Sequence, residues 1–238
     1  MAEYAPISKS NLSTQIAQHI ENLILSQELK VGDKLPGELD LAEQYCASRN
    51  IVREAIATLK VRGLVDVRNG SGAYIAQPDS ALLTDVVNRL VIFGSATAYE
   101  VYEVRMALEV RACGLAAEHA DEADINLLQD LLGKMERDYR NDDLWPEYDY
   151  EFHELIAKMT GISLYQAFLR PLIAIVQGIA YKNPTSIKAR QSGLAAHKKI
   201  LAAIQTRQRD QAESAMSSHL NGFLLDLVES IEKGEKSE

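Results

Sequence analysis

The sequence has few cysteines and no long apolar run, and each scarcity excludes a class of protein. Cys46 and Cys113 are its only cysteines, too few for a disulfide framework and consistent with a reducing compartment. The longest nearly apolar run, Leu172 to Ala180, contains Gln177 and is far shorter than the ~18 residues of a membrane span. The first residues lack a basic start followed by an apolar stretch, so no secretory signal is expected. We therefore expect a cytoplasmic protein without membrane contact.

Positive charge is also scarce, and what there is lies unevenly along the chain. The formal net charge of -9 over 238 residues argues against a nonspecific nucleic-acid coat, because phosphate contacts supply most of such binding. Residues 1–76 hold 8 Lys and Arg against 9 Asp and Glu, and residues 77–238 hold 17 against 25. Residues 48–70 nevertheless carry a local net charge of +3. A small basic patch on a near-neutral domain is more typical of a site-specific DNA reader.

Residues 1–76 are predicted to form three helices and a β-hairpin. Apolar residues at helical spacing indicate a first helix over 11–27. A short helix begins near Pro36, and Ser48 is the expected N-cap of a third helix that ends before Gly63. Two strands, 64–68 and 73–76, flank Asn69-Gly70, a pair that tight hairpins prefer. This order predicts a winged helix-turn-helix, whose third helix enters the major groove.

Two arginines on the third predicted helix suit DNA. Arg49 and Arg53 are four residues apart near its N-terminal end, where a guanidinium can donate two hydrogen bonds to a guanine edge or grip a phosphate. The alternative is that they form the solvated face of a surface helix. The agreement of helix order, spacing and hairpin favours the DNA reading.

Residues 35–76, LPGELDLAEQYCASRNIVREAIATLKVRGLVDVRNGSGAYIA, resemble the DNA-binding domain of the GntR family of bacterial transcription regulators. The resemblance and the basic patch together predict operator contacts from Ser48, Arg49, Asn50, Arg53, Arg68, Gly70 and Gly72. Two departures bear on the operator sequence. Leu39 stands where the family often has an arginine, which removes one base or phosphate contact. Asn50-Ile51 replaces the common Thr-Pro or Thr-Thr, and an asparagine pairs well with adenine.

Residues 77–81 are the predicted linker, and residues 82–238 are predicted to be helical throughout. The evidence is apolar periodicity, few glycines or prolines inside segments, and no run that alternates with period two. The expected helices cover 82–93, 97–119, 122–140, 146–160, 162–182, 186–206 and 210–232. Seven such helices form a bundle, whose sites are built from side chains on facing helices. The fold class is therefore mainly α, a winged helix-turn-helix followed by an all-α bundle.

Three histidines and one aspartate predict a metal site in this bundle. Asp149 and His153 lie one turn apart beside an apolar stripe. His197 and His219 each lie eleven residues from Gln208, so an antiparallel helix pair places both at the same height, about 16 Å from that turn at 1.5 Å per residue. Each histidine alone could be a hydrogen-bonded core residue. Together they suit a shared divalent ion, Zn²⁺, Ni²⁺ or another first-row metal, since burying four unpartnered polar groups is costly.

The C-terminal part also carries a resemblance. Arg105 to Glu109, Leu115-Ala116-Ala117 and the metal-site residues with their spacing are similar to the effector domain, the FCD domain, of FadR-type GntR regulators. In such proteins the metal and an arginine at the position of Arg105 hold a carboxylate-bearing metabolite. A metal with open coordination positions and a guanidinium make an anion trap. The alternative for Arg105 is a salt bridge with Glu109 or another nearby acid.

The leading interpretation is a metabolite-responsive transcription regulator, a repressor, and not an enzyme. It would act as a homodimer on a palindromic DNA operator and respond to a small organic acid such as a sugar acid, a hydroxy acid or a dicarboxylate. One alternative is a metal-dependent hydrolase, which lacks an obvious general base because Glu151 and Glu154 point away by helical phase. The other is a pure metal sensor with no organic effector.

Overall fold

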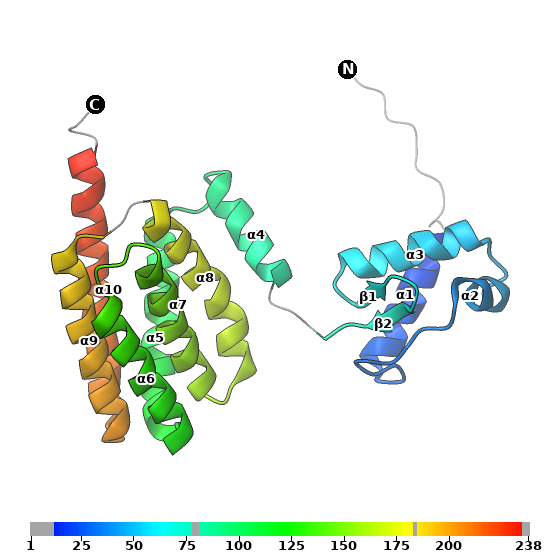
Figure 1. Ribbon diagram of the computed structural model, residues 1–238. Helices are drawn as coiled ribbons and strands as arrows, with labels where there is room; N and C mark the ends of the chain where they lie inside the picture. Colours follow the sequence, from blue (N-terminus) through cyan, green and yellow to red (C-terminus); the bar gives the residue numbers. More distant parts are fainter. Residues whose placement is uncertain (1–11, 78–80, 183–184, 235–238) are drawn as a thin grey trace. The chain divides into compact units, whose positions relative to one another are not determined.

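The computed structural model describes residues 12–77, 81–182 and 185–234 (Figure 1). The chain divides into two compact units, Met1–Asp79 and Ser80–Glu238, and each unit has its own hydrophobic core. Residues 78–80 of the predicted linker lie outside the described residues.

The N-terminal unit has the predicted order of a winged helix-turn-helix. Its elements are α1 (Leu12–Leu25), α2 (Glu38–Gln44), α3 (Arg49–Val61), β1 (Val65–Arg68) and β2 (Gly72–Ile75). Helix α1 packs against α3, and Ile16, Ile20 and Leu59 are almost wholly buried between them. As predicted, Ser48 is the N-cap of α3, and its side chain accepts a hydrogen bond from the backbone N–H of Ile51 at 3.4 Å.

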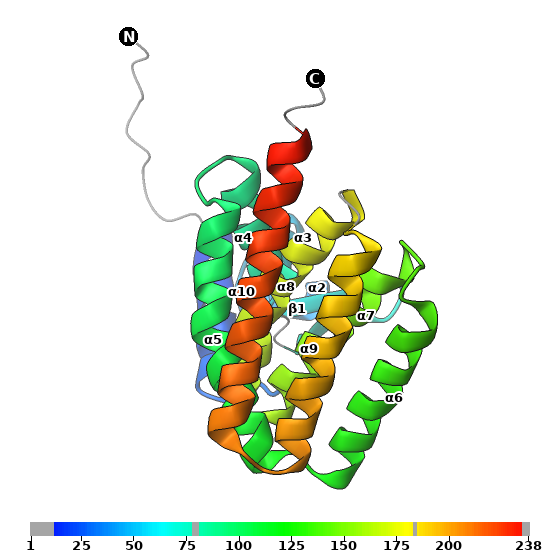
Figure 2. The same ribbon diagram turned by 90° about the vertical axis from the view of Figure 1, so that its left-hand side faces the viewer.

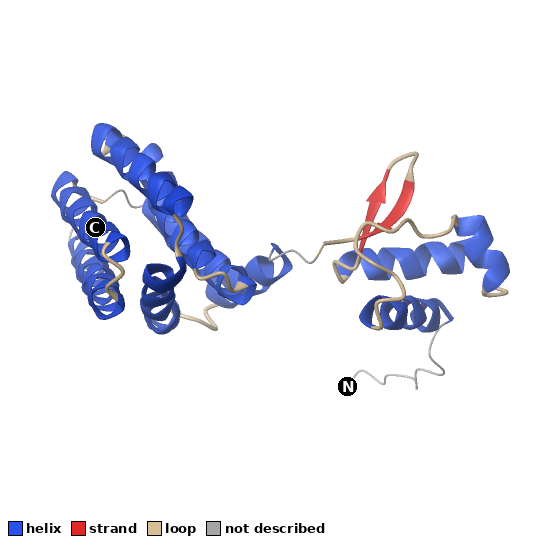
Figure 3. Cartoon of the chain, turned by 90° about the horizontal axis from the view of Figure 1, so that it is seen from below, coloured by secondary structure: helices blue, strands red, loops and turns tan. Residues whose placement is uncertain are grey.

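The two strands form an antiparallel hairpin, drawn in red in Figure 3. Val65 lies opposite Ile75 and Arg68 opposite Gly72. The chain turns through Gly70, whose φ of 74° lies in the region that side chains with a Cβ rarely adopt. The predicted Asn-Gly turn is therefore the element that reverses the chain.

The C-terminal unit consists of the seven predicted helices. They are α4 (Ala81–Ile92), α5 (Ala98–His119), α6 (Glu122–Asp138), α7 (Leu144–Met159), α8 (Ser163–Lys182), α9 (Ile187–Gln205) and α10 (Arg209–Gly234). Helix α7 begins at Leu144, two residues before the predicted start at Pro146. The Asn141 side chain accepts hydrogen bonds from the backbone N–H groups of Asp143 and Leu144, so the helix starts earlier and Pro146 falls in its first turn, where its missing N–H costs little.

Helix α10 lies beside both α5 and α9 (Figure 2), and α7 packs against α5, α6 and α8. The largest core cluster draws on α5, α6, α7, α9 and α10, with Phe152 and Ile200 fully buried in it. The faces of α7, α9 and α10 that carry the predicted metal ligands therefore meet inside one core.

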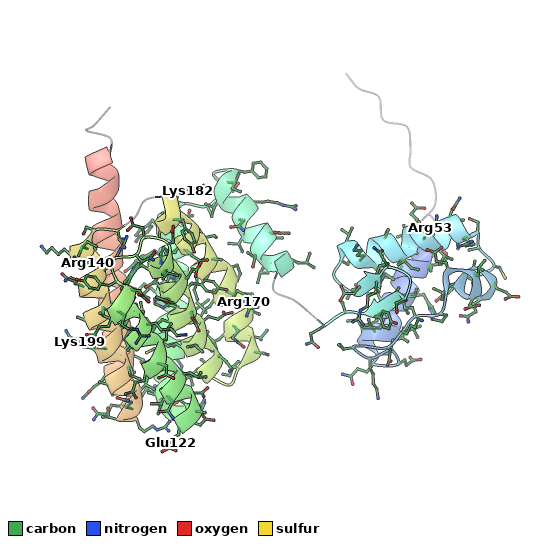
Figure 4. All side chains as sticks on the ribbon, in the orientation of Figure 1. Arg53, Glu122, Arg140, Arg170, Lys182 and Lys199 are labelled. Carbon is green, nitrogen blue, oxygen red and sulfur yellow. The ribbon has the colours of Figure 1, made fainter. Side chains whose placement is uncertain are left out.

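Helix α8 is long and apolar enough to cross a membrane by length and composition alone. It packs against α4, α5 and α7, with Leu169 and Ile173 only 0% and 2% exposed. Arg170, which Figure 4 labels, forms an ion pair with Glu154 on α7. Helix α8 is therefore packed on other helices of the bundle.

Replacing Leu59 by alanine should destabilise the N-terminal unit by about 2–5 kcal/mol, because a fully buried leucine leaves a cavity. Val61 on the same helix is 78% exposed, so Val61→Ala is the matched control and should change stability by no more than about 0.5 kcal/mol. Hydrogen exchange of the backbone amides of α1 and α3 in the full chain measures both effects. Equal loss of protection in the two variants would contradict this account of the core.

Candidate metal centre and nucleic-acid interface

The four predicted metal ligands come together in the helical unit. His153 extends from α7, His197 from α9 and His219 from α10, with Asp149 one turn before His153. One ligand atom from each of the four lies within 4.8 Å of all the others. The equal heights expected for His197 and His219 are realised, because their Nε2 atoms are 3.1 Å apart.

The distances between these atoms fit a shared ion. The Nε2 atom of His219 lies 3.2 Å from that of His153, and the Nε2 atom of His197 lies 3.5 Å from Oδ1 of Asp149. Metal–nitrogen bonds of about 2.0–2.1 Å place neighbouring ligand atoms about 3.0–3.4 Å apart. A ring nitrogen offers one hydrogen or one lone pair, so His219 Nε2 cannot form full hydrogen bonds with two other imidazoles. A cation at the point where they converge satisfies all of them.

The surroundings keep the imidazoles of His197 and His219 neutral, which is the form that binds metals. Burial lowers the pKa of His197 well below its ordinary value, and the nearby His219, His153 and Arg105 lower it further. Burial, His153 and Arg105 likewise lower the pKa of His219 to about 3. Burial raises the pKa of the Asp149 carboxyl, a cost that a divalent cation beside it would offset.

Glu109 is a site residue that the sequence did not single out as a partner of the histidines. The residue is 1% exposed, and its carboxylate contacts both Nδ1 of His153 and Nε of Arg105. Burial alone would raise the pKa of Glu109, but Arg105 and His153 together hold it well below its usual range. A carboxylate on Nδ1 directs Nε2 of His153 toward the other ligands, as partners behind metal ligands commonly do. The sequence feature that could have identified Glu109 was its position as a charged residue on the apolar face of α5.

Arg105 is linked to the histidine cluster through Glu109, which contacts both Arg105 and His153. It is 3% exposed and forms the salt bridge with Glu109 that the sequence left open as its alternative role. A cavity of about 190 Å³ adjoins the cluster, and its lining includes Asp149, His219 and Arg190 but not Arg105. Among the charged groups of the described residues, Arg190 is therefore the guanidinium that meets this cavity.

The predicted DNA-contacting arginines lie on the surface of α3. Arg49 and Arg53 have side chains that are 53% and 59% exposed, and Figure 4 labels Arg53. Both pair with Glu38 at the start of α2, at 3.4 Å and 3.0 Å. These pairings lower the pKa of the Glu38 carboxyl, against the opposing effect of its partial burial. The sequence did not predict that Glu38 pairs with these arginines, because α2 and α3 are brought together only by the fold.

The other predicted DNA contacts are also exposed. Asn50 lies in the first turn of α3, and Arg68, Gly70 and Gly72 lie on the hairpin. The guanidinium of Arg68 lies 4.4 Å from the ring centroid of Tyr74, which holds the charge on the hairpin surface. Leu39, where a family arginine often stands, is 63% exposed.

A thiol reagent should modify Cys46 and leave Cys113 intact in the folded protein. Cys46 is exposed, whereas Cys113 is buried on α5, and burial, with smaller effects of Glu109 and Glu213, raises the pKa of its thiol to about 12. Thiolate reactivity requires access and ionisation. Absorbance titration should count one reactive thiol in native protein, two after unfolding, and none in native Cys46→Ser. Rapid reaction of a second thiol in native protein would contradict the packing of α5.

Comparison with known proteins finds a matching family model for each of the two units. Residues 12–75 match the family model described as "Bacterial regulatory proteins, gntR family", and residues 100–222 match the FCD domain. The chain is 29% identical to the HTH-type transcriptional regulator LutR of Bacillus subtilis (strain 168), over 83% of this chain and 93% of that protein. It is 28% identical to the HTH-type transcriptional repressor NanR of Edwardsiella tarda (strain FL6-60), over 91% of this chain and 85% of that protein.

A solved structure shares the architecture. The Streptococcus agalactiae GntR structure superposes with a TM-score of 0.68 at 29% identity and covers 89% of this chain and 98% of that chain. The matched families and relatives are transcription regulators and not enzymes. This chain belongs to the gntR family of bacterial regulatory proteins, with a helix-turn-helix domain followed by an FCD domain.

Proposed function

We propose that the chain is a repressor whose affinity for DNA is controlled by a small carboxylate held beside a divalent transition metal. Asp149, His153, His197 and His219 would hold the ion, zinc or nickel by the chemistry of three imidazoles and a carboxylate. The observation that carries the proposal is the convergence of these four groups beside a cavity. When bound, the ion would supply the positive charge that attracts a carboxylate.

Two observations favour this proposal over its alternatives. A cavity beside the cluster favours an organic effector over a pure metal sensor, for which no such space is needed. A hydrolase would need a free general base, whereas Glu109 is engaged by His153 and Arg105 and Glu154 by Arg170. The term repressor rests on the printed name of the NanR relatives.

The proposal includes a homodimer and a palindromic operator. Helix α4 and the turn after it carry apolar side chains that are 44% to 78% exposed, namely Leu82, Val86, Leu90 and Phe93. A two-fold dimer would pair two DNA readers with two half-sites, and effector binding would be coupled to their spacing. Light scattering should give about twice the chain mass of 26.4 kDa; a mass of one chain, with or without DNA, would contradict the dimer.

The double variant Asp149→Ala, His153→Ala should lose the metal, because two of four ligands are removed. Elemental analysis after zinc loading should find about one ion per chain in the parent protein and little in the variant. His119→Ala is the matched control, since it removes an exposed imidazole that contacts the Thr160 carbonyl outside the cluster. Parent protein that takes up no metal after loading would reduce the three histidines to core residues.

The same variants test regulation. The operator is first selected from random DNA, and small carboxylic acids are screened for one that releases the parent protein from it. The same acid should release His119→Ala from the operator, whereas it should have no effect on DNA binding by the double variant. A double variant that folds, as judged by circular dichroism, and still responds to the acid would contradict the role of the metal.

Removing the carboxylate of Glu38 should strengthen binding to nonspecific DNA. In the free protein Glu38 partly neutralises Arg49 and Arg53, and phosphates must displace it. Exposed ion pairs are weak because water screens them, so Glu38→Gln should raise nonspecific affinity by only about 1.5- to 5-fold. It should also lower the ratio of specific to nonspecific affinity.

Glu43→Gln is the control, because Glu43 is exposed on the same helix and pairs with neither arginine. Fluorescence anisotropy at several salt concentrations measures both variants. An equal rise in nonspecific affinity would mean that net charge alone is responsible and that the pairing has no effect.

A further inference from the structure

We infer that Leu39 contacts the 5-methyl group of a pyrimidine base, which in ordinary DNA is thymine, in the major groove beside the first turn of α3. The inference rests on the proposed function, because it needs the DNA contacts proposed for Arg49, Asn50 and Arg53. It is carried by the exposure of Leu39, by its position next to Glu38, and by the charges of the residues around it.

Leu39 is a large apolar side chain on the surface of the N-terminal unit. It is 63% exposed, whereas Leu41 and Ala42 on the same helix are buried in the core of this unit. Covering a surface leucine in a complex is favourable, because apolar area is then removed from water. Replacing Leu39 leaves the core intact, so an effect of the replacement on DNA binding reports a contact made outside the chain.

The fold brings Leu39 close to the arginines of α3. Helix α2 packs against α3, and the Glu38 carboxylate contacts Arg49 at 3.4 Å and Arg53 at 3.0 Å. Leu39 is the next residue of α2. In a helix-turn-helix, the N-terminal residues of the second helix meet the base edges, and the first helix crosses the DNA backbone. Leu39 would therefore approach the DNA next to the bases that α3 contacts.

The charges around Leu39 favour a base edge over a phosphate as its partner. The side chain of leucine has no charge and no hydrogen-bond donor, so it cannot hold a phosphate. Asp40 and Glu43 are exposed on the same helix, and their carboxylates would repel one. The cations of α3 would therefore hold the backbone, and Leu39 is left to contact a base. One leucine between acidic residues is also much smaller than the apolar patches that bind other proteins.

Thymine offers a leucine a suitable partner in the major groove. Its 5-methyl group distinguishes it there and is the group that apolar side chains contact. Most other base-edge groups are hydrogen-bond donors or acceptors, which a leucine would cover without pairing. Asn50, in the first turn of α3, can pair with adenine, so both side chains would favour A·T pairs in the same part of a half-site.

Removing methyl groups from single thymines tests the inference. The operator is first selected from random DNA with the full-length protein, and each thymine is then replaced in turn by deoxyuridine, which lacks only the methyl group. Fluorescence anisotropy measures the affinity for each duplex. At one thymine or more in a half-site, the replacement should weaken binding by the parent protein about three- to fivefold, the effect of one covered methyl group.

Substitutions of Leu39 assign the methyl contact to this side chain. Leu39→Ala should make that thymine and deoxyuridine equivalent, because the contact is lost when either partner is removed. Leu39→Met keeps an apolar side chain of similar volume and should keep the preference for thymine. Leu25→Ala is the matched control, since Leu25 is 72% exposed at the end of α1, and it should leave the preference unchanged.

A second base separates the methyl group from the rest of thymine. At the same position, 5-methylcytosine should bind the parent protein about three- to fivefold more tightly than cytosine, and Leu39→Ala should bind both bases equally. Equal binding of the two bases by the parent protein would contradict a contact with the methyl group.

Two further results would overturn the inference: deoxyuridine at no position weakens binding by the parent protein, or Leu39→Ala keeps the full preference for thymine at every position. An operator that is bound tightly without this dependence on methyl groups leaves the proposed function standing. Parent protein that selects no operator from random DNA would instead be the failure of the proposed function, and of this inference with it.

Discussion

The effector unit depends on the burial of three imidazoles at one point between helices α7, α9 and α10. Polar rings in a core must find partners, and the facing Nε2 atoms of His153, His197 and His219 cannot satisfy one another by hydrogen bonds alone. The same closeness that is unfavourable for three unpartnered rings is the geometry that a divalent ion requires. In the proposed function, the atoms that decide the stability of this unit are therefore also those that bind the metal.

Charge is arranged around this point in pairs. Arg105 is paired with Glu109 behind His153, and Arg190 is paired with Asp142 at the cavity. Each buried guanidinium thus has a carboxylate, which a buried cation requires. On the N-terminal unit, Glu38 pairs with Arg49 and Arg53 in an exposed setting, where water screens the interaction and phosphates can replace the carboxylate. Ion pairs of similar composition are therefore fixed inside the bundle, whereas the pairs on α3 would, in the proposed function, exchange with DNA phosphates.

Much of the fold was predictable because its signals are local. Apolar periodicity indicated all seven bundle helices, and Asn69-Gly70 indicated the hairpin turn between β1 and β2. The start of α7 was misplaced by two residues, because side-chain hydrogen bonds from Asn141 begin the helix before Pro146. The convergence of the metal-site residues was also predictable, since it depends on helical phase and on equal distances of His197 and His219 from one turn.

The sequence by itself determined the two-part organisation, the family, the helices and the four residues that converge in the bundle, because each of these rests on spacing within one element or across one short turn. Only the tertiary structure decided which charged groups meet. It joined Glu109 to His153 and Arg190 to Asp142, placed Arg105 behind the cluster and Arg190 at the cavity, and brought Glu38 to the arginines of α3. Such contacts join side chains on different elements, and their partners are set by helix packing, which no local pattern of residues encodes.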